Sequence, residues 1–200
     1  MNRPYKIFYF NIVEIALALA VIGIGIAGIM TLFPVALNAS RDSVGDNNAP
    51  LVAEEMLTYI EARANAETDV GWTGSGIIGQ LPITKPNNSP TAVNEVPFDA
   101  AHNINGTNIY MVNNSLYGIL LTSTNAGGQE VTDFSAIIRV WKQQIPAGSL
   151  YIEGNMVPSA ALGYQYGADV FVEVSWPSEK PYGQREKRVY MLELFNPNLS

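Results

Sequence analysis

Few residues in this sequence are of the types that do chemistry. His102 is the only histidine and there are no cysteines, which excludes two-histidine metal sites, cysteine-based metal sites and thiolate chemistry. The motifs of phosphate-binding loops, nucleophile elbows and zinc proteases are also missing from the sequence. We therefore predict no catalytic residue, no cofactor and no enzymatic activity.

Calcium binding needs only oxygen ligands, and two polar stretches contain them. Asp42 and Asp46 lie next to Asn47 and Asn48, and Asp99 lies in a second polar stretch. Neither stretch has the spacing of an EF-hand loop. We expect solvated turn residues at both places and predict no metal site.

Glu14 has the most unusual setting of the acidic residues. It stands at the entrance of a segment, Ile15 to Ser40, that has no charged side chain. A lone carboxylate within lipid costs roughly 2.5 to 3.5 kcal/mol on insertion scales. Glu14 must therefore reach the membrane interface or find a cationic partner.

The segment after Glu14 is long enough to cross a membrane as a helix. At 1.5 Å per residue, roughly 20 apolar residues span the hydrocarbon layer, whereas the apolar part of a signal peptide has only about 7 to 15. Arg3 and Lys6 precede the segment, and positive charge favours a cytoplasmic location. We predict a single-pass protein of the cytoplasmic membrane with its N-terminus inside and its C-terminal part outside.

Small residues interrupt this apolar segment at Gly23, Gly25 and Gly28, and Pro34 follows them. Glycine allows close approach of a neighbouring helix, and proline weakens the helical hydrogen-bond ladder. These four residues predict a helix that packs against other helices. Because glycine is common in transmembrane helices generally, an ordinary single-pass anchor explains the glycines equally well.

The sequence as a whole predicts an α+β fold, in which a long N-terminal hydrophobic helix is followed by a head with an antiparallel β-sheet. The helix is expected at residues 10–66, with a membrane or filament-core part at about 10–40 and an amphipathic second part at about 50–66. Residues 41–50, which contain Gly45 and Pro50, predict an interruption between the two parts. The apolar face of the second part comprises Leu51, Val52, Met56, Tyr59 and Ile60.

Residues 67–200 predict a mostly β globular head. Its expected strands are 77–84, 108–112, 116–122, 134–142, 169–176 and 188–195, with a turn at 113–115. Six tyrosine and tryptophan residues lie late in the chain, and Tyr164, Gln165 and Tyr166 are candidates for an adhesive surface, although core packing accounts for them equally well. The formal net charge is −7, which disfavours nucleic-acid binding by the head.

The run Phe10, Asn11, Ile12, Val13, Glu14, followed by alternating apolar residues, resembles the start of type IV pilins and pseudopilins. The continuation from Phe33 to Arg41 is similar to PilV-like minor pilins. The resemblance covers about residues 8 to 41. It implies that residues 1–9 are a basic leader, that Phe10 is the first mature and N-methylated residue, and that Glu14 pairs with the amino terminus of a neighbouring subunit during assembly.

Residue 9 departs from the family pattern. Prepilin leaders end in glycine or sometimes alanine, whereas this chain has Tyr9 before Phe10. Three alternatives follow: cleavage between Tyr9 and Phe10, cleavage at another position, or an uncleaved anchor.

The sequence therefore supports two alternative hypotheses for the function. The first is a structural subunit, a minor pilin or pseudopilin, of a type IV pilus or a related secretion system. Its implied partners are other pilin subunits, a prepilin peptidase, a membrane assembly platform and membrane lipid. The second is an uncleaved, membrane-anchored module for extracytoplasmic binding or cell adhesion.

Overall fold

The computed structural model describes residues 11–66, 72, 74–87, 90–93, 95–104, 106–146, 150–152, 155–157 and 161–198. The chain divides into two compact units, Met1–Val44 and Gly45–Ser200. Helix α1 (Ile12–Asn65) begins in the first unit and ends in the second.

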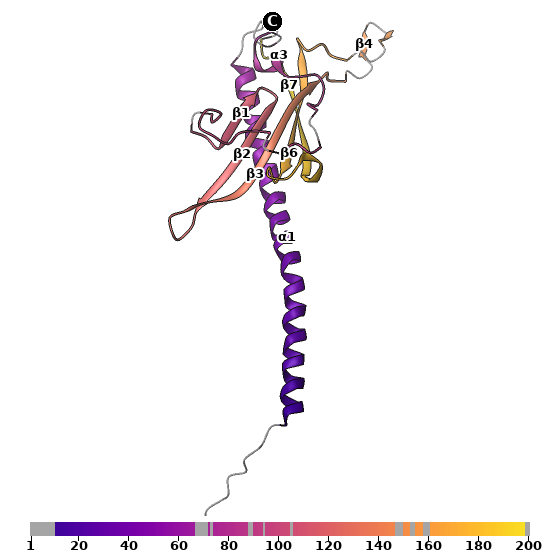
Figure 1. Ribbon diagram of the computed structural model, residues 1–200. Helices are drawn as coiled ribbons and strands as arrows, with labels where there is room; N and C mark the ends of the chain where they lie inside the picture. Colours follow the sequence, from indigo (N-terminus) through magenta and orange to yellow (C-terminus); the bar gives the residue numbers. More distant parts are fainter. Residues whose placement is uncertain are drawn as a thin grey trace, which may run out of the picture. The chain divides into compact units, whose positions relative to one another are not determined.

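The second unit is built around an antiparallel sheet with the strand order β1-β2-β3-β6-β7 (Figure 1). These strands are β1 (Ile109–Asn113), β2 (Leu116–Thr124), β3 (Glu130–Gln143), β6 (Gly167–Trp176) and β7 (Glu186–Phe195). Two short strands, β4 (Leu150–Ile152) and β5 (Asn155–Val157), pair with each other. The predicted α+β class, a long apolar helix followed by an antiparallel sheet, is confirmed.

The sheet follows from alternation in the sequence. Successive side chains of a strand point to opposite faces, and in β6 the residues Ala168, Val170, Val172, Val174 and Trp176 are all buried in one core cluster with α1. β7 pairs with β6 in an unbroken register. The predicted hairpin around Asn113 is also present, since β1 and β2 pair antiparallel across it.

The head segment of α1 packs on one face of this sheet. The side chains that it contributes to the core are Ala49, Val52, Ala53, Met56, Ile60 and Ala64. Three alanines in this set let the helix lie close to the strands. Including Leu51 in the apolar face was wrong, because its side chain is 63% exposed. The buried face is marked instead by alanines, which contribute little to a hydropathy pattern.

The predicted interruption at residues 41–50 is also wrong, because α1 is continuous through Gly45 and Pro50. Proline inside a helix costs about 3 kcal/mol. Burial of Ala49, Val52 and Met56 in the core offsets that cost. Tertiary packing therefore outweighs local propensity here.

The segment predicted as a strand at 77–84 contains instead a single helical turn, α3 (Ile77–Gln80). Ile77, Ile78 and Leu81 are all buried. An apolar run this short has no measurable period, and only its packing decides its conformation. A turn of 3-10 helix, η1 (Tyr182–Gln184), lies between β6 and β7. β4 and β5 were not predicted.

Candidate functional site

The N-terminal unit exposes an apolar surface. Its exposed large side chains are Ile12, Val13, Ile15, Leu17, Leu19, Val21, Ile22, Ile24, Ile26, Ile29, Met30, Leu32, Phe33, Val35 and Leu37. By length and composition α1 can cross a membrane, and none of its most apolar window is buried within the chain. An apolar surface of this extent needs lipid or protein to cover it.

Glu14 lies in the first turn of α1. Asn11 caps this end of the helix: its side-chain oxygen accepts a hydrogen bond from the Val13 N–H at 3.3 Å, and its carbonyl accepts one from the Glu14 N–H at 2.9 Å. The Glu14 side chain is exposed among apolar neighbours. Its carboxylate is therefore presented to the surroundings of the helix and not to the chain's own core.

Gly23, Gly25 and Gly28 leave open space around the helix. A Cβ added at any of them meets no heavy atom within 4 Å. Pro34 lies within the helix, and Thr31 donates a side-chain hydrogen bond to the Gly28 carbonyl at 2.8 Å. Tyr9 and Phe10, the predicted processing residues, lie outside the described residues.

A second feature, which we call the charge cluster, lies on the sheet face opposite α1. It comprises Lys85, Glu95, Arg139, Glu173, Tyr182 and Arg185. Arg139 on β3 and Glu173 on β6 are directly opposite each other in the register, and the Arg139 Nη1 donates to Glu173 Oε1 at 3.0 Å. Both side chains are almost completely buried, with 0% and 2% exposed.

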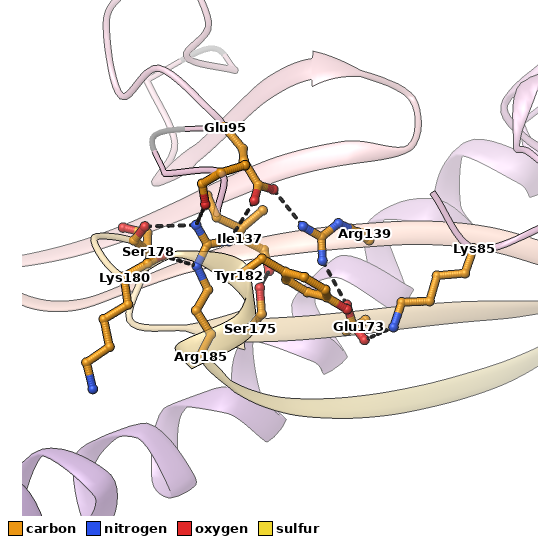
Figure 2. A network of polar contacts seen from close by, with 11 residues as sticks. Lys85, Glu95, Ile137, Arg139, Glu173, Ser175, Ser178, Lys180, Tyr182 and Arg185 are labelled. Carbon is orange, nitrogen blue, oxygen red and sulfur yellow. Dashed lines mark hydrogen bonds and ion pairs between the residues drawn. The ribbon is translucent and has the colours of Figure 1, made fainter. Parts of the chain in front are cut away.

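Two loops extend this cluster away from the sheet (Figure 2). From the first loop, Glu95 accepts hydrogen bonds from Arg139 Nη2 at 2.6 Å and from Arg185 Nη1 at 3.3 Å, and Lys85 pairs with Glu173. From the second loop, Tyr182 donates to Glu173 at 3.1 Å, and its ring lies 3.9 Å from the Arg139 guanidinium carbon. The cluster thus fastens both loops to the sheet.

The electrostatics of the cluster follow from burial and pairing. Burial lowers the pKa of Arg185, although Glu95 acts in the opposite direction. For Lys85, burial lowers the pKa, but the hydrogen bonds to Glu173 and Tyr182 outweigh this and the net shift is upward. The charged forms of these cations satisfy buried carboxylates. The arrangement is suited to holding the head together.

Other charged residues form simple pairs. His102 Nδ1 lies 2.7 Å from Asp99 Oδ1, and Arg188 Nη2 lies 2.7 Å from Asp46 Oδ1. The hydrogen bond from His102 is the main cause of a lowered pKa of Asp99. Among the described residues, no three histidine, aspartate or glutamate side chains converge in a way that could hold a metal ion.

The tyrosines considered for an adhesive surface have separate settings. The Tyr164 ring lies 4.8 Å from Lys142 Nζ, and its carbonyl accepts a 2.8 Å hydrogen bond from Trp72 Nε1. Tyr164 also packs partly buried against the core. Tyr166 is 45% exposed. Tyr164 therefore serves the packing of the head, whereas Tyr166 is available at its surface.

Sequence reasoning missed the charge cluster. The available signal was a charged residue inside a short apolar run in each of two predicted strands, Arg139 in IIRVW and Glu173 in VEV. A charge at a position flanked by buried residues requires a partner. Only the strand register identifies which one.

Comparison with protein-family models, with curated proteins and with solved structures finds no match for this chain. The residues and their geometry therefore carry the functional proposal.

Proposed function

We propose that this chain is a structural subunit of a type IV pilus-like filament or a related secretion system, a minor pilin or pseudopilin that assembles through its N-terminal helix. One observation carries the proposal: residues 12–37 of α1 expose an almost continuous apolar surface, while residues 49–64 of the same helix contribute the core of an α+β head. Such a helix has one part for lipid or neighbouring helices and one part for its own domain.

Glu14 supports an assembly role over a simple anchor. Its carboxylate lies among exposed apolar side chains, where lipid disfavours the charged form. The family resemblance implies that the new amino terminus of a neighbouring subunit provides the missing cation. Pairing with an ammonium removes the desolvation problem in the filament while leaving it in the free subunit, so it favours assembly.

The proposed location follows from the same helix and its flanking charges. Arg3 and Lys6 precede the apolar segment, which favours a cytoplasmic N-terminus and a head outside the membrane. The proposed partners are fellow pilin subunits, a prepilin peptidase and a membrane assembly platform. Surface attachment or secretion would be a property of the assembled filament.

The deciding experiment is intact-mass measurement and N-terminal sequencing of the chain from membranes and from sheared surface material of its native host. We expect a chain beginning at Phe10, N-methylated and present in the sheared fraction. A chain that keeps Tyr9 and occurs only in membranes would contradict the proposal and favour the uncleaved binding module.

The assembly carboxylate is tested by Glu14→Gln, with Glu55→Gln as the matched control because Glu55 is exposed on the head segment of the same helix. We expect Glu14→Gln to leave membrane insertion unchanged and to lower incorporation into filaments, whereas Glu55→Gln changes neither. Equal incorporation of the two variants would refute the role of Glu14.

A further inference from the structure

The last strand of the sheet has an open outer edge. β7 pairs with β6 from Glu186 to Phe195 without a shift in register. The opposite edge of the sheet is covered, because Met111 on β1 donates its N–H to the His102 carbonyl at 2.7 Å. Within the part of the chain that the structure describes, no segment pairs in this way with the outer edge of β7.

The hydrogen bonds at the end of β7 show which backbone groups face outward. Asn196 donates its N–H to the Tyr166 carbonyl at 2.9 Å, and this pair continues the register of β7 with β6. Backbone groups of alternate residues in an antiparallel strand point to opposite sides. Val189, Met191 and Glu193 therefore direct their N–H and C=O groups away from β6, where no backbone group of a described residue bonds to them.

The side chains along this edge are mostly apolar, with one basic and one acidic residue among them. Val189, Met191 and Phe195 are 51%, 55% and 58% exposed, and Lys187 and Glu193 are exposed beside them. Proteins normally shorten, bulge or cover such an edge to prevent pairing with other chains. β7 is long and regular, and no described strand pairs with its outer edge, which suits strand addition.

On the helix side of the sheet, a groove runs beside the same strand. It has a volume of about 720 Å³ and is lined by Asp46, Pro50 and residues 186–190. An added strand places alternate side chains on the two faces of the sheet. The groove offers space for those that point toward α1.

We propose that the outer edge of β7 binds an extended segment of another protein, which joins the sheet as an additional antiparallel strand. The outward N–H and C=O groups supply the hydrogen bonds, and the apolar side chains supply buried area. Strand addition of this kind derives affinity from the main chain and specificity from alternate side chains.

The residues of β7 specify the chemistry of the bound segment. Opposite Glu193 a basic side chain fits, opposite Met191 and Val189 apolar ones, and opposite Lys187 an acidic one. From its N-terminus to its C-terminus, the bound segment therefore has the pattern basic-x-apolar-x-apolar-x-acidic. The charges at its two ends set its register.

A second copy of this chain is the main rival occupant, because β7 itself carries the pattern, from Lys187 to Glu193. Antiparallel pairing of two β7 strands requires a two-fold axis perpendicular to the sheet. The head segments of α1, residues 45–65, would then run in opposite directions in the two copies. Another protein that carries the stated pattern is the assigned occupant, and a second copy is the contrary outcome of the crosslinking test below.

Binding at the outer edge of β7 can be tested with the full chain in detergent and a fluorescently labelled synthetic peptide of residues 186–195. This peptide has the required pattern and is free to approach the edge in either direction. We expect saturable binding in fluorescence anisotropy and slower amide hydrogen exchange at Val189, Met191 and Glu193. Absence of saturable binding, or binding without protection of these amides, would overturn the proposed strand addition.

A charge exchange tests the register without altering the backbone. In the protein variant Glu193→Lys, two lysines face each other in the complex, and we expect binding about threefold to tenfold weaker. A peptide with Lys187→Glu should restore it. The variant Met191→Pro removes one outward N–H and should abolish binding. Weakening that the exchanged peptide does not reverse would contradict the antiparallel register.

The source of the strand is tested in the native host by a photo-crosslinking amino acid at Val189, with Val112 on the covered edge as control, since both valines are exposed. We expect an adduct at Val189 only, joined to a different protein within a segment of the stated pattern and lost in Met191→Pro. An adduct with a second copy, or equal yields at both positions, would overturn the assignment to another protein. None of these three tests depends on cleavage at Tyr9.

Discussion

Gly45 of α1 lies directly against the indole of Trp176 on β6. A Cβ placed on Gly45 would stand 1.8 Å from Trp176 Nε1 and 2.5 Å from its Cδ1. The helix can approach the sheet at this point only because residue 45 has no side chain. Gly45 lies in the segment predicted to interrupt the helix, but its position against Trp176 shows that it permits packing.

Gly45→Ala should therefore destabilise the head. Alanine gains about 1 kcal/mol over glycine in helix propensity, but displacing a buried tryptophan costs typically 1 to 3 kcal/mol or more. We expect a net loss of up to about 2 kcal/mol in the free energy of unfolding, measured by denaturant titration of the full chain in detergent. The control is Gly23→Ala, where the added Cβ meets no atom within 4 Å and the head should be unaffected. Equal stability of the two variants would contradict the packing role of Gly45.

Removing Arg139 should destabilise the head strongly. Arg139→Met leaves the buried carboxylates of Glu95 and Glu173 without their shared partner, and breaking a buried ion pair on one side costs about 3 to 5 kcal/mol. Chemical denaturation measures the loss. The matched control is Arg188→Met, which breaks an exposed pair with Asp46 and should cost less than about 1 kcal/mol.

The double variant Arg139→Met with Glu173→Leu separates pairing from packing. Because it removes both buried charges, it should recover part of the stability lost in Arg139→Met. A double variant less stable than the single one would show that Glu173 has a separate essential role.

Alternation and long-range pairing differ in how far they could be predicted. The stretches DVFVEVSW and RVYMLELF predict β6 and β7 because a period of two is a local property. Arg139 and Glu173 are 34 positions apart, and nothing local encodes their contact. Similarly, the charge of Glu14 is visible in the sequence, whereas the open edge at Met191 depends on which strand ends the sheet.

The continuity of α1 is a second feature that local sequence did not predict. Gly45 and Pro50 both predict a break by propensity, yet α1 continues through them. The deciding energy comes from burial of this part of α1 in a core that strands much later in the chain complete, for example with Val172. Propensity is a weak prior where a helix is also a core element.

Tyr117 should reduce the stability of the head, especially at alkaline pH. Its hydroxyl is buried without a hydrogen-bond partner among the described residues, and burial raises its pKa well above the usual value. In the unfolded chain tyrosine ionises near pH 10. Since the folded state holds the proton more tightly than the unfolded chain does, ionisation of Tyr117 leaves the free energy of unfolding unchanged below pH 10 and lowers it as pH rises above 10.

The variant Tyr117→Phe should therefore be more stable by about 1 kcal/mol at pH 7, because it removes an unsatisfied buried hydroxyl. Above pH 10 the difference should grow by up to about 1.4 kcal/mol per pH unit. Urea titrations between pH 7 and 11 measure both effects. Tyr166→Phe, at an exposed position, is the control and should change stability little; a Tyr117→Phe variant that is less stable at pH 7 would reveal an unrecognised partner.

Enlarging Gly25 and Gly28 tests whether the N-terminal helix packs against other helices. The added side chains meet nothing within the chain, so Gly25→Leu with Gly28→Leu should leave membrane insertion and head stability unchanged. If neighbouring subunits approach at these positions, the bulk prevents close contact, and we expect a clear loss of filament incorporation, measured by quantitative immunoblotting of sheared material. Ala27→Leu, at an exposed alanine between them, is the matched control and should have a smaller effect. If all these variants assemble like the unaltered chain, lipid alone covers this part of the helix and the glycines have no packing role.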